Sequence, residues 1–242
     1  HLFCWSPSAE LGDYYERAVY NHILASQDPV SGGVTYFVPL KSGECKHYSD
    51  PLNDFSCCHC TGMENHGKYG DSIYFHSEET LWINLFIASE LKWEAKGLKV
   101  VQRTRFPDDD SMIFDFNAEK PVRIDLRIRK PYWAEHGLTV VLNGESVECS
   151  VGADGYVSID REWKDGDELK VTIPMSLRLE PIAGNPRRVA FLYGPVVLAG
   201  DLGPVDQPLP TDAKIPVLLT ADTDPEHWTK QIEKDDLHFA TV

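Results

Sequence analysis

Strict alternation of apolar and charged side chains marks the run Val122-Arg123-Ile124-Asp125-Leu126-Arg127-Ile128-Arg129. Successive side chains of a β-strand point to opposite faces, so the four aliphatic residues share one face and the charged residues share the other. This pattern is typical of a strand with one face on a core and the other in water. We therefore predict a half-buried strand of an antiparallel sheet.

Similar short runs follow one another through the middle of the chain. We expect further strands at residues 72–75, 80–88, 98–106, 111–116, 138–142, 156–159, 169–173 and 189–198. Turn-forming pairs lie between several of them, at Asn143-Gly144, Asp154-Gly155 and Asp165-Gly166. Many short strands separated by such turns indicate a β-sandwich.

The first 75 residues have a different pattern. Between residues 10 and 25, apolar side chains recur every three or four positions, which predicts one amphipathic helix with that side buried. The residues of this apolar side are Leu11, Tyr14, Tyr15, Ala18, Val19, His22 and Ile23. We expect a short strand at 34–40 and, at 57–70, a loop that runs into a short helix.

These patterns predict three parts of the chain. Residues 1–75 form a helical N-terminal part, 76–200 a β-sandwich domain, and the Pro-rich 201–242 a linker with the start of a further segment. The chain starts at His1 without a Met or a leader-like stretch, so we expect it to be internal to a longer protein. A leader upstream would predict a periplasmic or extracellular protein, and its absence a cytoplasmic one.

Composition excludes some classes of function. The 23 Lys and Arg against 38 Asp and Glu give a net charge of −15, which argues against nucleic acid as a partner. No run of eighteen apolar residues is present, so no membrane-spanning helix is predicted. The 42% hydrophobic content is enough for a folded core.

Chemically reactive side chains concentrate in one segment, 57–70, which carries three thiols, two imidazoles and a carboxylate. Thiolates at this spacing suit Zn²⁺, although the chain has no second pair of ligands of the zinc-finger type. Two other interpretations stay open at this point. Cys57 and Cys58 could be small buried side chains without a metal, and Cys57-x-x-Cys60 could be a redox motif.

Several phrases of the sequence resemble one known family. Cys57-Cys58 is followed by Thr61-Gly62-Met63-Glu64-Asn65-His66, and supporting phrases lie at 11–24, 33–40, 69–74, 127–133 and 191–200. Together they resemble the cysteine-dependent β-L-arabinofuranosidases of glycoside hydrolase families 127 and 146. The resemblance implies the C-terminal end of an (α/α)₆ barrel, followed by an antiparallel β-sandwich.

The resemblance also implies a retaining hydrolase that releases β-L-arabinofuranose from arabinose-containing plant glycans with a zinc-bound cysteine. Cys57 would be the nucleophile and a zinc ligand, and Cys58 a second ligand. Two more ligands, in a Glu-x-Cys motif, and the acid/base carboxylate would lie upstream of His1, so the chain alone is expected to be inactive. Glu16 and Tyr36 match positions that contact the sugar.

Some residues depart from the family pattern or have simpler explanations. Relatives commonly carry an aromatic residue before the cysteine pair and small residues after it, where this chain has Ser56 and His59-Cys60. Glu16 could instead form an ion pair on an exposed helix face, and Tyr36 could be a core residue. We expect the remaining cysteines to be structural; they are Cys4, Cys45 and Cys149.

Two other classes of function are compatible with the sequence. One is a non-catalytic carbohydrate-binding β-sandwich with tryptophans that stack on sugars, although such tryptophans more often fill a sandwich core. The candidates are Trp82, Trp93, Trp133 and Trp163. The other is a structural zinc module.

Overall fold

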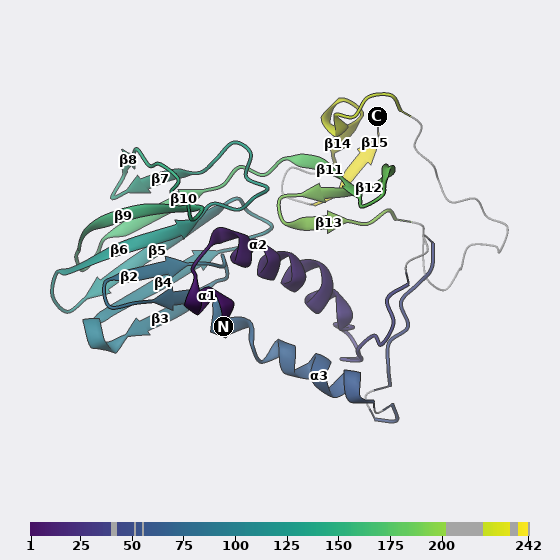
Figure 1. Ribbon diagram of the computed structural model, residues 1–242, viewed down its shortest axis with the longest axis horizontal. Helices are drawn as coiled ribbons and strands as arrows, with labels where there is room; N and C mark the ends of the chain where they lie inside the picture. Colours follow the sequence, from purple (N-terminus) through teal and green to yellow (C-terminus); the bar gives the residue numbers. More distant parts are fainter. Residues whose placement is uncertain (40–42, 51, 55, 202–219, 233–236, 242) are drawn as a thin grey trace.

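A computed structural model gives the fold (Figure 1). It describes residues 1–39, 43–50, 52–54, 56–201, 220–232 and 237–241. Short helices form the N-terminal part, and two stacked sheets follow them in the chain. A smaller sheet lies beside the longest helical segment.

The two stacked sheets form the predicted β-sandwich. The first has the order β1-β2-β6-β9 and consists of β1 (Tyr74–His76), β2 (Thr80–Ile83), β6 (Val122–Arg129) and β9 (Tyr156–Trp163). The second has the order β3-β4-β5-β10-β7-β8. Its strands are β3 (Ser89–Trp93), β4 (Leu98–Thr104), β5 (Ser111–Ala118), β10 (Glu168–Thr172), β7 (Thr139–Leu142) and β8 (Glu145–Val147). The ladders are antiparallel except that of β2 with β6, which is parallel.

Inward-facing side chains of both sheets fill one core. From β6, Ile124, Leu126 and Ile128 are buried, as the alternation predicts. Phe114 and Phe116 of β5 face them from the second sheet and belong to the same cluster. A continuous aliphatic and aromatic core between two sheets holds the sandwich together.

The turn signals and strand limits agree with the prediction in part. Asn143 and Gly144 both have positive φ, 51° and 84°, and join β7 to β8 in a two-residue hairpin. The predicted strand 80–88 is wrong in its second half, because β2 ends at Ile83 and the chain crosses to the other sheet before β3 begins at Ser89. The predicted strand 189–198 is divided by the turn between β12 and β13.

The helical part begins with α1 (Leu2–Trp5) and α2 (Ala9–Ala18). α2 continues into a π-helical turn, η1 (Val19–Ile23), and a 3₁₀ turn, η2 (Leu24–Ser26), so the predicted helix at 10–25 is confirmed. After a segment of loops come α3 (Cys57–His66) and η3 (Tyr69–Ser72). The remaining 3₁₀ turns are η4 (Glu94–Lys96) and η5 (Pro225–His227).

The predicted buried side of the helix at 10–25 is confirmed only in part. Val19 of η1, on that side, is 3% exposed, whereas Tyr14 is 77% exposed. Within α2 the buried residues are instead Ala9, Gly12 and Glu16. Gly12 explains the close approach: a Cβ at this position would lie 2.3 Å from Asn84 Oδ1 and 2.6 Å from Arg129 Cδ. The sandwich thus packs on the small and acidic side of the helix.

Arg129, at the end of β6, joins α2 to the sandwich. The alternation placed this residue on the solvent side of its strand, but its side chain is 0% exposed. Its guanidinium donates to Asp13 and Glu16 of α2, and its Nε donates to the Asn84 carbonyl at 2.7 Å. Each of the three guanidinium nitrogens therefore donates to an oxygen acceptor, and a buried ion is tolerated under this condition.

The electrostatics of this ion-pair cluster follow from burial and charge. Desolvation alone would lower the pKa of Arg129, but the charges of Glu16 and Asp13 outweigh it and raise the pKa above the usual value. For Asp13 desolvation acts in the opposite direction and raises the pKa of the carboxyl, because burial disfavours its charged form. The charge of the Arg129 guanidinium offsets only part of this increase. The charges of Arg129, Glu16 and Asp13 thus stabilise one another, and removal of any one of them leaves a buried charge without its full set of partners.

A third sheet packs against the C-terminal part of the helical segment. It consists of β11 (Leu177–Ile182), β12 (Asn185–Tyr193) and β13 (Val196–Leu198) in that order. Arg17 forms a bidentate ion pair with Glu180 of β11, at 2.6 and 2.8 Å. The Asn21 side chain donates to the Pro195 carbonyl at 2.8 Å and accepts from the Val197 amide at 2.7 Å. The predicted range 76–200 thus holds the sandwich and this separate sheet.

Two further predictions concern less regular parts. The predicted strand 34–40 is wrong for its described residues, because Val34 and Thr35 form only isolated bridges, to Gln27 and Tyr48. Most of the predicted linker at 201–242 lies outside the described residues; the part inside forms η5 and a hairpin of β14 (Thr229–Gln231) and β15 (Phe239–Thr241). Among the described helices, none has the length and apolar character to cross a membrane.

The ion-pair cluster predicts a large difference between two arginines of β6. Replacing Arg129 by Met leaves Asp13 and Glu16 buried without their cation, and should lower the free energy of unfolding by about 3–5 kcal/mol. Arg123→Met removes a solvent-exposed pair with Asp160, which water screens, and should lower the free energy of unfolding far less. Urea denaturation of both variants measures the difference, and equal losses would contradict the assigned role of Arg129.

Candidate active site

The cysteine-rich segment forms the N-terminal turn of α3. Ser56 is the N-cap: its extended backbone precedes the helix, and its Oγ accepts from the His59 amide at 3.4 Å. Cys57 is the first helical residue, and Thr61 Oγ1 donates to its carbonyl at 3.0 Å. The predicted loop into a short helix is thus a helix that starts at the cysteine pair.

Cys57 and Cys58 are exposed, so the interpretation as small buried side chains is wrong. Their sulfur atoms lie 3.7 Å apart. Two sulfurs that bind one tetrahedral zinc, each at about 2.3 Å, lie about 3.8 Å apart, so the spacing fits two ligands of one ion. Among the described residues, no group of three or more His, Cys, Asp or Glu side chains is placed to hold a metal.

Tyr36 lies beside the cysteine pair, although it is far from it in sequence. Hydrogen bonding with the Cys58 side chain, together with the charges of Cys58 and Cys57, raises the pKa of Tyr36 above its usual value. The Tyr36 ring meets the His59 ring edge-on, with centroids 5.9 Å apart, and the side chain is 47% exposed. Tyr36 is therefore a surface residue of the site and not a core residue.

Two histidines of α3 occupy the surroundings of the site. His66 Nδ1 forms a 2.6 Å hydrogen bond with the Tyr69 hydroxyl, which ties the end of α3 to η3. His59 Nδ1 is buried and has no hydrogen-bond partner among the described residues. His59 contacts Tyr36, and no feature of its sequence position predicted that contact.

Glu16 does not join this site, which corrects its expected sugar contact. It is 1% exposed, and its two carboxylate oxygens accept from Arg129 and from Trp133 Nε1, the latter at 2.9 Å. No carboxylate surface is left for a sugar. The alternative of an ion pair was right about an arginine partner and wrong about an exposed face. Asp13 and Glu16, three residues apart on one helix face, were the available signal for a buried cation.

The remaining thiols lie apart from this turn of α3. Cys4 and Cys45 are exposed, and Cys149 packs against the sandwich core, where burial raises the pKa of its thiol. The expected structural role therefore fits Cys149. It does not fit Cys4 and Cys45, because both side chains are exposed and are not packed in a core.

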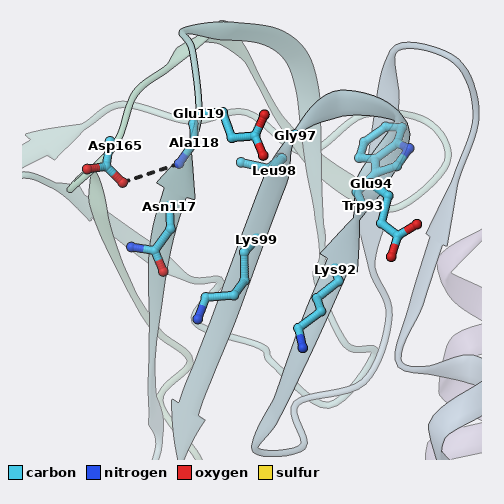
Figure 2. A pocket seen from close by; sticks show the side chains of 10 residues that line it. All are labelled: Lys92, Trp93, Glu94, Gly97, Leu98, Lys99, Asn117, Ala118, Glu119 and Asp165. Carbon is cyan, nitrogen blue, oxygen red and sulfur yellow. Dashed lines mark hydrogen bonds between the residues drawn. The ribbon is translucent and has the colours of Figure 1, made fainter.

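A hollow of about 500 Å³ lies on the six-stranded sheet, at the ends of β3, β4 and β5 (Figure 2). Lys92 and Lys99 line it together with Glu119 and Asp165. Trp93 also lines it, but this indole is 7% exposed and lies between the His76 ring, at 4.9 Å, and Lys96, at 5.8 Å. The ring is therefore covered.

The other three candidate tryptophans are also packed in the protein. Trp133 and Trp163 are buried in the core, and Trp82 packs against Phe3 and Arg127. This agrees with the expectation that such tryptophans fill a sandwich, and it gives no support to sugar stacking.

Comparisons with known proteins agree with both parts of the fold. Residues 1–71 match the model of the β-L-arabinofuranosidase GH127 catalytic domain, and residues 80–175 match the GH127 middle domain. The chain belongs to glycoside hydrolase family 127. The helical part is thus from the catalytic domain and the sandwich is the middle domain, which confirms the predicted family and fold class.

Solved structures show the same fold. A GH127 β-L-arabinofuranosidase from Geobacillus stearothermophilus T6 is 22% identical, with a TM-score of 0.68 over 81% of this chain and 33% of that chain. The GH127 β-arabinofuranosidase BT3674 is 25% identical, with a TM-score of 0.69 over 81% and 34%. The family 127 chain described here thus spans about a third of the length of these relatives. A comparison with curated proteins gave no significant match.

The cap of α3 gives a prediction for the site. Ser56→Ala removes an acceptor of the His59 amide. Because this bond is long, at 3.4 Å, its loss should weaken the first turn by about 0.5 kcal/mol, the low end for a cap, which is about twofold faster amide hydrogen exchange. Thr61→Ala is the matched control, because the Thr61 hydroxyl bonds only a carbonyl within the helix. This substitution should change the exchange rate little. Hydrogen exchange followed by mass spectrometry of the peptide that contains residues 56–66 measures both, and equal rates in all three proteins would contradict the cap.

Proposed function

We propose that this chain carries the nucleophile and half of the zinc site of a retaining β-L-arabinofuranosidase. The observation that supports the proposal most directly is the exposed pair of thiols, 3.7 Å apart, at the start of a helix that belongs to a GH127 catalytic domain. The substrate is an arabinose-containing plant glycan or oligosaccharide.

Cys57 is the nucleophile of this proposal. Its thiolate attacks the anomeric carbon, and the leaving aglycone takes a proton from a carboxylic acid. Water then hydrolyses the thioglycosyl intermediate, and two displacements at one carbon give net retention. Sulfur takes the place of the second carboxylate of an ordinary retaining glycosidase.

Cys57 and Cys58 would hold the zinc, because their sulfur spacing fits a tetrahedral ion. When bound, zinc keeps thiols deprotonated that would otherwise be mostly protonated at neutral pH. In the proposal, the other two ligands and the acid/base carboxylate are outside residues 1–242, so the chain alone does not hydrolyse the substrate.

Tyr36 would contribute the polar surface next to the cysteines. Its ring is held by the edge contact with His59, and its hydroxyl is fixed by the Cys58 sulfur. A half-exposed phenol beside the nucleophile is suited to contact a bound sugar. Glu16 has no place in this proposal, because it belongs to the buried ion-pair cluster.

Hydrolysis tests the role of the nucleophile. In a protein extended at its N-terminus to the length of the solved relatives, Cys57→Ala should lower kcat/KM for an aryl β-L-arabinofuranoside at least about a thousandfold, because the attacking atom is lost. Cys4→Ala changes an exposed thiol of α1, outside the site, and should keep full activity. Full activity of the Cys57→Ala protein would overturn the assignment.

Cobalt binding tests the metal half-site in residues 1–242. Thiolate ligands of Co²⁺ give a near-ultraviolet charge-transfer band, which we expect for the wild-type chain and for a Cys4→Ser, Cys45→Ser double variant. The Cys57→Ser, Cys58→Ser double variant should lose this band. A band that survives in the second double variant would show that other residues bind the metal.

A further inference from the structure

A third thiol, Cys60, lies one helical turn after Cys57 and has no part in the proposed pair of zinc ligands. Cys57 is exposed and Cys60 is half-buried. Residues three apart on a helix share a face, with Cβ atoms about 5–6 Å apart, whereas a disulfide requires about 3.5–4.5 Å. Bridging these two thiols therefore requires the first turn of α3 to tighten by about 1–2 Å.

The first turn of α3 is held by long hydrogen bonds. The His59 amide is 3.4 Å from Ser56 Oγ, and the Cys60 amide is 3.4 Å from the Ser56 carbonyl. Typical N–H···O distances are about 2.9–3.0 Å, so these bonds resist displacement weakly. A small rearrangement of residues 57–60 is thus inexpensive compared with one in the middle of a helix.

Cys58 is a poorer partner for Cys57 than Cys60, although its sulfur is only 3.7 Å away. A disulfide between adjacent residues closes an eight-membered ring that strains the intervening peptide. Cys60 does not have this restriction.

We propose that Cys57 and Cys60 form a reversible oxidation site for hydrogen peroxide, with Cys60 as the resolving thiol. The inference rests on the proposed function only in treating Cys57 as the nucleophile. Accessible thiols next to a resolving cysteine are the usual sites of such chemistry.

The reaction balances in two steps. The Cys57 sulfur attacks one peroxide oxygen, an S–O bond forms as the O–O bond breaks, and the released hydroxide takes a proton to give water. The Cys60 sulfur then attacks Cys57, an S–S bond forms as the S–O bond breaks, and a second water leaves. Two thiols are oxidised by two electrons, and one peroxide is reduced to two waters.

The disulfide would switch the site off and protect it. It occupies the nucleophile and one zinc ligand together, and a thiol reductant restores both. Without Cys60, the sulfenic acid on Cys57 stays open to further peroxide and proceeds to the irreversible sulfinic acid.

The test uses metal-free residues 1–242 treated with stoichiometric hydrogen peroxide and analysed by fragment-ion mass spectrometry after the free thiols are blocked. We expect a Cys57–Cys60 link that dithiothreitol reverses, in the wild type, in Cys58→Ser and in the control Cys4→Ser. In Cys60→Ser and Cys60→Ala, sulfinic acid on Cys57 should increase at least about fivefold.

A Cys57–Cys58 link in the wild type, or equal sulfinic acid with and without Cys60, would overturn the proposal. The readout is covalent and needs no hydrolysis, so this proposal and the proposed function fail separately. If no Cys57–Cys60 disulfide forms but hydrolysis is lost in Cys57→Ala, only the oxidation site is overturned. If the disulfide forms but hydrolysis persists in Cys57→Ala, only the assignment of the nucleophile is overturned.

Discussion

The buried charge of Arg129 sets how the helical and sheet parts fit together. A guanidinium with no exposed surface must have acceptors on every side, and α2 supplies two of them while the sandwich supplies the Asn84 carbonyl. Tyr156 extends this network, because its hydroxyl donates to the Asn84 side chain at 2.9 Å. Gly12 is then required at the point of closest approach, since any Cβ would collide with the same arginine.

From this joint the helical part leads to the cysteine site, and the Tyr15 hydroxyl of α2 donates to the Lys68 carbonyl, between α3 and η3, at 3.4 Å. α2 runs into η1 and η2, the chain then passes Tyr36, and α3 begins at Cys57. The acidic side of α2 faces the sandwich, whereas Tyr14 of α2 and Trp5 of α1 are 77% and 80% exposed. The helical part thus meets the sandwich through small and acidic residues and leaves two large aromatic side chains uncovered.

Local sequence predicted most of the sandwich and some of the site. The alternation of β6 and the Asn143-Gly144 turn depend on neighbours in the chain, so they could be recognised without the structure. Burial of Arg129 depends on acceptors more than 110 residues away, and a strand pattern alone places it in water. The cysteine pair was evident from its density of thiols, but its contact with Tyr36 depends on how the chain between them folds.

Asn21, in the π-helical turn η1, donates from Nδ2 to the Arg17 carbonyl at 3.1 Å. The same amide side chain bonds the carbonyl of residue 195 and the amide of residue 197, both of them main-chain atoms of the third sheet. Recognition of β13 by this asparagine therefore does not depend on which side chains β13 carries. Substitutions in β13 that keep its backbone in place therefore leave this attachment intact, whereas Asn21 itself has no equivalent substitute that both donates and accepts with the same reach.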